Sequence, residues 1–137
     1  MKNFLFLLAA VAFVFTACND DLELKSGNAE SLAGSWVSPV YEDSIYTFIR
    51  AEALKENEYG LTLKSNNQLV ERKNAGWCGT PPIAYSDFTG NWTITDSTLY
   101  ISTMFWGGTA HYQWKLISVD SQKLVVERIK EDYIFNE

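Results

Sequence analysis

The stretch from 98 to 118 reads Thr-Leu-Tyr-Ile-Ser-Thr-Met-Phe-Trp-Gly-Gly-Thr-Ala-His-Tyr-Gln-Trp-Lys-Leu-Ile-Ser. In a strand successive side chains point to opposite faces, so every second residue shares a face. The residues that would share one face are Leu99, Ile101, Thr103 and Phe105 before the glycine pair, and Tyr112, Trp114 and Leu116 after it. Two glycines accept the positive backbone angles of a two-residue hairpin turn. We therefore predict two antiparallel strands joined at Gly107 and Gly108.

The same period of two continues through most of the chain from residue 31 onward, with Asn, Asp and Ser at the turns. The expected strands are 36–41, 44–50, 59–64, 68–73, 92–95, 99–105, 110–118 and 123–130, with a final short strand at 133–135. Only Arg50 to Asn57 has a helical pattern. Short turns between consecutive strands predict one all-β domain, residues 32–137. We expect an up-and-down antiparallel β-barrel of about eight strands, because closure removes unpaired edges. An open β-sandwich is the alternative.

The composition restricts the classes of function. The chain has 137 residues, with 11 Lys+Arg against 17 Asp+Glu and a formal net charge of −6. This acidic excess argues against nucleic-acid binding, which needs cationic side chains to replace phosphate counterions. The single histidine, His111, has no cysteine or carboxylate at metal-ligand spacing, and its strand phase directs it to solvent. No nucleophile motif is present. The sequence predicts a non-enzymatic protein with no catalytic residue, no metal and no cofactor.

The first residues resemble the signal peptide of a bacterial lipoprotein. Lys2 precedes an unbroken apolar run at 4–15, which is too short to span a membrane. Phe15-Thr16-Ala17-Cys18 then resembles a lipobox, in which the Cys thiol receives a diacylglycerol and the preceding peptide is removed. The resemblance predicts a signal peptide at 1–17 and a lipid on Cys18. Cleavage after Ala17 that leaves a free thiol is the alternative.

Residues 18–31 are the expected lipidated Cys and flexible acidic tether. Asp20, Asp21 and Glu23 follow Cys18, which resembles the export signal of surface lipoproteins in Bacteroidota. A solvated tether explains the same residues, so the periplasmic and the surface face both stay open. We expect a monomer anchored to the outer membrane through Cys18.

Two related segments open strands in the body of the chain. Gly34 and Trp36 stand at the start of the first strand, and Gly90 and Trp92 repeat the Gly-x-Trp spacing. Glycine permits a sharp entry into a strand, and tryptophan supplies a large apolar plug.

Gly-x-Trp at the start of a small barrel resembles the lipocalin signature, and residues 31–135 resemble the lipocalin-like domains of small bacterial lipoproteins. The resemblance implies a barrel that holds a ligand, with Trp36 at its closed end under a basic side chain of the last strand. Arg128 is the matching residue. The Thr-Asp-Tyr signature of larger lipocalins is absent at 118–121. A short barrel rich in aromatic residues can also fill its own interior.

The segment 74–85 interrupts the alternation with two Gly, two Pro and the thiol of Cys78. We interpret it either as a binding loop at the barrel mouth or as a structural loop over the barrel end, with Cys78 as a small buried hydrophobe. The first functional hypothesis is binding of a small apolar or amphipathic ligand inside the barrel, because aromatic side chains that line such a cavity supply much of the binding affinity. The candidate contacts are Trp77, Tyr85, Phe105, Trp106, Tyr112 and Trp114. The alternative is an envelope protein–protein interaction or inhibitor module with a filled interior.

Overall fold

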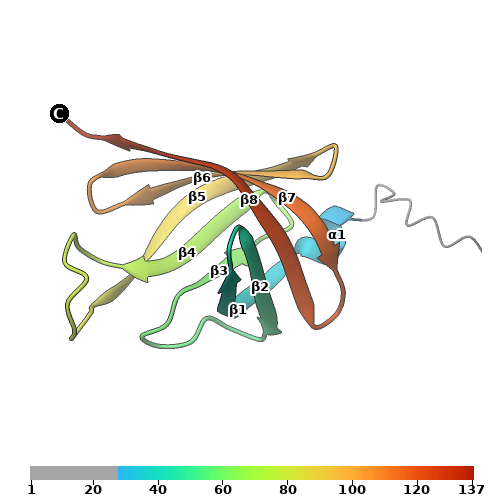
Figure 1. Ribbon diagram of the computed structural model, residues 1–137, viewed down its shortest axis with the longest axis horizontal. Helices are drawn as coiled ribbons and strands as arrows, with labels where there is room; N and C mark the ends of the chain where they lie inside the picture. The colour runs from blue at the N-terminus through green and yellow to red at the C-terminus, as the bar shows by residue number, and fades with distance from the viewer. Residues whose placement is uncertain (1–27) are drawn as a thin grey trace, which may run out of the picture.

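The computed structural model describes residues 28–137 (Figure 1). The predicted signal peptide, Cys18 and most of the predicted tether lie outside the described residues. A short helix, α1, comes first and eight strands follow. The elements are α1 (Asn28–Leu32), β1 (Gly34–Glu42), β2 (Ile45–Ala51), β3 (Gly60–Leu63), β4 (Gln68–Asn74), β5 (Tyr85–Thr95), β6 (Thr98–Phe105), β7 (Gly108–Val119) and β8 (Lys123–Phe135). In this described part, no helix has the length and apolar character needed to cross a membrane.

The strands form a closed antiparallel barrel in the order β1-β2-β8-β7-β6-β5-β4-β3. The prediction of an all-β fold with a closed, eight-stranded antiparallel barrel is therefore confirmed. Two strands are much longer than the alternation indicated. β5 begins at Tyr85, and β8 runs without interruption to Phe135, so the expected short strand at 133–135 is its last part.

The connectivity differs from a simple meander at one place. β1 lies between β2 and β3, and so the connection 52–59 passes from one side of β1 to the other. The side chains of Leu54, from this connection, and of Val37 both lie close to Gly60. Val37 is buried, although it does not belong to the main core cluster inside the barrel. The connection therefore covers the outer face of β1.

The helix predicted at Arg50 to Asn57 is wrong. Arg50 and Ala51 complete β2, and the residues after them form bends and turns. A helix of two turns is marginal by itself. Here the carbonyls of Leu54 and Lys55 instead accept hydrogen bonds from Arg72 Nη1, at 3.3 and 3.1 Å. Tertiary bonds have replaced the helical ones.

One end of the barrel is closed by apolar side chains and by α1. The largest buried core side chains are Trp36, Trp92, Trp114, Phe48, Leu32, Leu61, Leu63, Leu69, Leu99, Leu116 and Leu124. Leu32, the last residue of α1, is fully buried. A helix end leaves backbone carbonyls without intrahelical partners. Trp36 Nε1 donates to Leu32 O at 2.8 Å, and Arg50 donates to the carbonyls on either side of it.

The cation over Trp36 comes from Arg50, whose guanidinium carbon lies 4.1 Å from the ring centroid. The predicted pairing of Trp36 with Arg128 is therefore wrong. Its physical reason is the strand order: β2, not β8, adjoins β1, and Arg50 is the register partner of Trp36. Arg128 lies over Tyr46 instead and donates to its hydroxyl at 3.0 Å.

Candidate functional site

The end of the barrel opposite α1 carries the β4–β5 connection and the C-terminus (Figure 1). The β1–β2 turn and the β6–β7 turn belong to the same end, because antiparallel strands alternate in direction. We call this end the rim. The strands leading to it carry polar side chains inside the barrel, whereas the α1 end is apolar.

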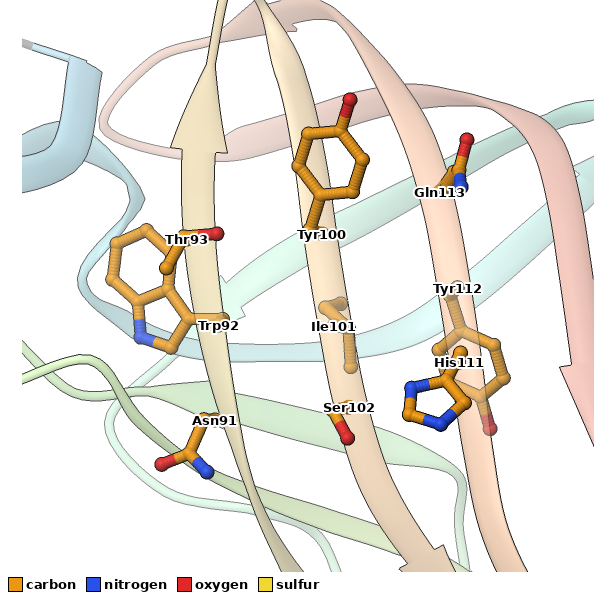
Figure 2. A pocket seen from close by; sticks show the side chains of 9 residues that line it. All are labelled: Asn91, Trp92, Thr93, Tyr100, Ile101, Ser102, His111, Tyr112 and Gln113. Atoms are coloured by element: carbon orange, nitrogen blue, oxygen red, sulfur yellow. The ribbon is translucent and has the colours of Figure 1, made fainter. Parts of the chain in front are cut away.

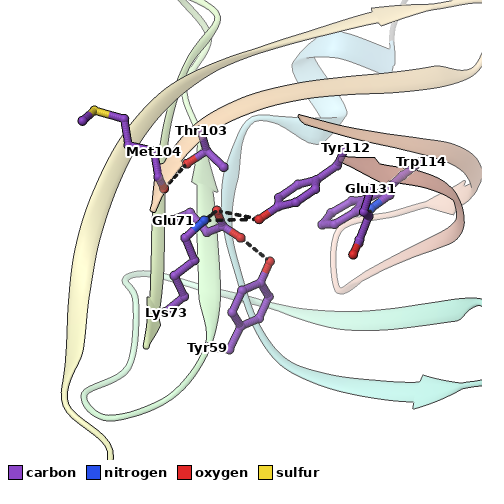
Figure 3. A network of polar contacts seen from close by, with 8 residues as sticks. All are labelled: Tyr59, Glu71, Lys73, Thr103, Met104, Tyr112, Trp114 and Glu131. Carbon is purple, nitrogen blue, oxygen red and sulfur yellow. Dashed lines mark hydrogen bonds and ion pairs between the residues drawn. The ribbon is translucent and has the colours of Figure 1, made fainter. Parts of the chain in front are cut away.

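A buried ion pair lies inside the barrel on the rim side (Figure 3). Glu71 of β4 is only 1% exposed, and its carboxylate lies 2.6 Å from Lys73 Nζ. Tyr59 Oη donates to the same carboxylate at 2.7 Å, and Tyr112 Oη lies 3.5 Å from it. A buried ion pair is tolerated only when further hydrogen bonds satisfy its charges. These side chains supply those bonds.

The two phenols in this cluster stay protonated. Burial, with the nearby Glu71 carboxylate adding to it, raises the pKa of Tyr59 and the pKa of Tyr112 well above the usual value. A phenol with a raised pKa keeps its proton and acts as a donor. The cluster is therefore a fixed polar plug across the barrel.

Glu131 of β8 is a second carboxylate on the inner wall. It accepts a hydrogen bond from Trp114 Nε1 at 3.3 Å and lies 3.8 Å from Arg128 Nη1. Burial is the main reason that the pKa of Glu131 is raised, and the indole bond and Arg128 oppose the shift. Burial likewise raises the pKa of Tyr41 to about 12.

The aromatic side chains of the interior pack on each other. Tyr112 and Trp114 are stacked, with ring centroids 5.4 Å apart and an interplanar angle of 3°. Phe48 stacks on Trp114 at 6.0 Å, and Tyr46 meets it edge-on at 5.7 Å. Tyr112 and Trp114 were expected to line a ligand-binding cavity. Their faces are instead covered by other side chains of the barrel.

The remaining predicted contacts lie in three other places. Phe105 and Trp106 stand at the β6–β7 turn, in edge-to-face contact with Phe135 of β8. Trp77 is 81% exposed on the β4–β5 connection. Tyr85 starts β5 and lines a hollow on the outer face with Arg72 and Asp87. The structure does not bring the six predicted contacts into one site.

The β4–β5 connection is held by its own short hydrogen bonds. Asn74 Nδ2 donates to Cys78 O at 2.6 Å, and Gly76 N donates to Asn74 Oδ1 at 3.0 Å. Cys78 is exposed, so the interpretation that buries this thiol under a packed loop is wrong. The bonds order the start of the segment without folding it over the barrel. His111 faces solvent, as its strand phase predicted.

A feature that the sequence analysis missed is an unpaired strand edge at the rim. The ladder between β2 and β8 ends at Ile45 and Glu127, whereas the ladder between β7 and β8 continues to Gly108 and Phe135. Within residues 28–137, no strand pairs with the side of β8 that faces away from β7 beyond Arg128. We call residues 129–135 on this side the free β8 edge. The sequence signal for this edge was the length of the last strand. The alternating pattern had divided that strand into two, 123–130 and 133–135.

Apolar side chains accompany this edge. The exposed ones along the edge, at the end of β6 and on the β6–β7 turn are Ile129, Tyr133, Ile134, Phe135, Met104 and Trp106. A single exposed apolar side chain is normal on a protein surface, but a group of them beside unpaired backbone is a typical binding surface.

No protein-family model, curated protein or solved structure matches this chain. The likeness to lipocalins therefore rests on the Gly-x-Trp motif and the strand pattern alone, and it stays a prediction.

Proposed function

We propose that this protein is a non-enzymatic, lipid-anchored module of the bacterial outer membrane that binds another envelope protein at the free β8 edge. The observation that carries the proposal is the combination of unpaired backbone and exposed apolar side chains on one strand. An extended segment of a partner can add to such an edge as a further strand. The backbone then gives affinity and the side chains give specificity.

The position of the edge supports this function. The chain enters the barrel at α1, and the rim lies at the other end (Figure 1). A lipid on Cys18 would thus attach the chain to the bilayer from the α1 end and leave the rim accessible to a partner. An unpaired apolar edge is a liability for aggregation unless it is covered or used.

Binding of a small ligand inside the barrel has less support. The stacked pair Tyr112 and Trp114 and the plug around Glu71 occupy the interior that such a ligand would need. This packing favours the hypothesis of a protein-binding module with a filled interior.

Photo-crosslinking in the producing cells tests the proposal. p-Benzoylphenylalanine placed at Ile129 or Ile134 should give one discrete crosslinked protein of defined mass, because both side chains border the edge. The same residue placed at Ile117, which is exposed near the α1 end of β7, is the matched control. Equal crosslinking from Ile117, or none from the edge, would contradict the proposal.

A second variant separates the edge from the residues around it. Lysine on an edge strand prevents strand addition, so Ile129→Lys with Ile134→Lys should abolish the crosslink formed from Phe135. Both side chains are exposed, and the fold should stay intact. Ile117→Lys should leave the crosslink unchanged.

The anchor is tested separately. Mass spectrometry of the mature protein should find a diacylglycerol and an acylated amino group on Cys18, and Cys18→Ala should release the protein from the membrane fraction. An unmodified Cys18 thiol in the mature protein would overturn this part of the proposal without affecting the β8 edge.

A further inference from the structure

A hollow of about 380 Å³ lies on the outer face of the barrel, over β5, β6 and β7 (Figure 2). Its volume is within the range of sites for small molecules. The polar side chains around it are Asn91, Thr93, Tyr100, Ser102, His111 and Gln113. The hollow is separate from the rim and from the free β8 edge, and nothing in the proposed function uses it.

Strand pairing arranges these six side chains in two rows across the three strands. The rows are Asn91, Ser102 and His111, and Thr93, Tyr100 and Gln113. Rows two residues apart are separated by about 7 Å, and the outer strands of three by about 10 Å. A footprint of this size fits one or two sugar rings.

The six side chains are available for a ligand. They carry amide, hydroxyl, phenol and imidazole groups, which both donate and accept hydrogen bonds. Within residues 28–137, none of these side chains hydrogen-bonds to another group of the protein. The fold therefore places a set of polar groups side by side on this face without using them for hydrogen bonds of its own.

The lining selects against charged ligands. It contains no carboxylate, ammonium or guanidinium group. On the adjoining strand β8, Lys130 and Asp132 stand beside Gln113 and His111, and they pair with each other at 2.6 Å. Lys115, the next outward-facing residue of β7 after Gln113, lies outside the lining. A phosphate or carboxylate would therefore find no ammonium or guanidinium group within the lining itself.

Tyr100 gives the hollow a flat apolar surface. Its side chain is 42% exposed and stands in the middle strand of the three. A sugar ring has an apolar C–H face and a periphery of hydroxyl groups, and it therefore complements an aromatic ring surrounded by amides and hydroxyls. We propose that this hollow binds a neutral saccharide, as one unit of a glycan chain that runs across the outer face of the barrel.

A titration followed by NMR tests this site. The probes are neutral tetrasaccharides of glucose, mannose, galactose, xylose and N-acetylglucosamine, added to the mature protein at millimolar concentration. At least one should shift the backbone amide signals of Asn91, Ser102 and Gln113. Tyr100→Ala should weaken that binding by about tenfold or more, through loss of the stacking surface. Trp77→Ala, at an exposed aromatic residue of the β4–β5 connection, should leave it unchanged.

Three results would overturn the proposal: no shift from any probe, shifts confined to another face, or equal binding by Tyr100→Ala. Tighter binding of an acidic tetragalacturonate would overturn the assignment to a neutral sugar. Crosslinking at the β8 edge is unaffected by each of these outcomes, and the two proposals therefore fail independently.

Discussion

At the scale of single residues, a side chain of the next strand explains why the first Gly-x-Trp segment begins with glycine. Gly34 has φ +139°, a conformation that L side chains rarely adopt, and a Cβ built there would collide with the Arg50 guanidinium. Only glycine allows Arg50 to reach the carbonyls of Ser31 and Ala33 while it lies on Trp36. Gly34 and Trp36 thus allow the hydrogen bonds that hold the end of α1 over this end of the barrel.

Gly34→Ala should therefore destabilise the protein by about 1–3 kcal/mol, because the backbone is strained and Arg50 must move. Urea unfolding monitored by tryptophan fluorescence measures the loss. Gly76→Ala is the matched control, since a Cβ there meets nothing within 4 Å. A loss of equal size in both variants would mean that Gly34 has no special role.

Glu131 should make stability depend on pH. Burial raises its pKa in the folded state, so the folded protein holds this proton more tightly than the unfolded chain. Folding then takes up a proton, and stability decreases as pH rises from the usual carboxyl pKa through the raised one. Glu131→Gln keeps an oxygen acceptor for Trp114 and removes the charge. It should increase the urea midpoint at neutral pH.

The gain from Glu131→Gln should disappear near about pH 3, where the wild-type carboxyl is also protonated. Asp132→Asn, at an exposed ion pair with Lys130, is the control and should change the midpoint little at either pH. A midpoint that falls at neutral pH in Glu131→Gln would show that the attraction to Arg128 outweighs burial.

At the scale of elements, local sequence determined the strands but not their neighbours. The period of two is a local property, and it located the β6–β7 hairpin. The two-residue turn is Trp106 and Gly107, one residue earlier than the predicted Gly107 and Gly108, because Gly108 pairs with Phe105. Which side of β1 receives β3 depends on the connection 52–59, whose Leu54 packs near Val37 and whose carbonyls bind Arg72 of β4. No local pattern predicts these long-range contacts. The Trp36 partner was wrongly predicted for the same reason, because it depended on strand order.

The candidate site was harder to predict than the fold. Trp114 and Trp77 are the same residue type, yet one is 1% exposed and the other 81% exposed. Strand phase places Trp114 on the inner face, but no periodicity exists in the β4–β5 connection to place Trp77. The free β8 edge follows only from the unequal lengths of the ladders on its two sides.

Arg72 should hold the connection 52–59 on β1. Its Nη1 donates to two carbonyls of the connection, while Nε and Nη2 bind Asp87 at 2.6 and 2.9 Å. Arg72→Met should increase cleavage at Lys55 by endoproteinase Lys-C by about tenfold, through loss of these bonds. Asp87→Asn leaves the carbonyl bonds in place and should change the cleavage rate little. Equal increases in both variants would assign the effect to the ion pair.

At the scale of the whole molecule, the two ends of the barrel differ. The α1 end is closed by apolar packing with every helix-end carbonyl from Ser31 to Ala33 hydrogen-bonded. Toward the rim, the interior holds the Glu71 plug and the strands separate, which leaves β8 unpaired on one side. A barrel that uses its interior for its own stability has its edges and outer face left for recognition.

Trp114→Ala tests whether the interior is filled. Trp114 is 1% exposed and contacts Tyr46, Phe48 and Tyr112. Its removal should cost about 3–5 kcal/mol and leave a cavity lined by these rings and by the Glu131 carboxylate that now accepts its indole hydrogen bond. The folded variant should then bind a small apolar molecule such as indole, whereas the wild type should not, and isothermal calorimetry measures both. Trp106→Ala, at the exposed rim, should cost about 1 kcal/mol or less and gain no binding. Tight indole binding by the wild type would instead show that an open cavity already exists. That result would support the hypothesis that the barrel interior binds a small molecule.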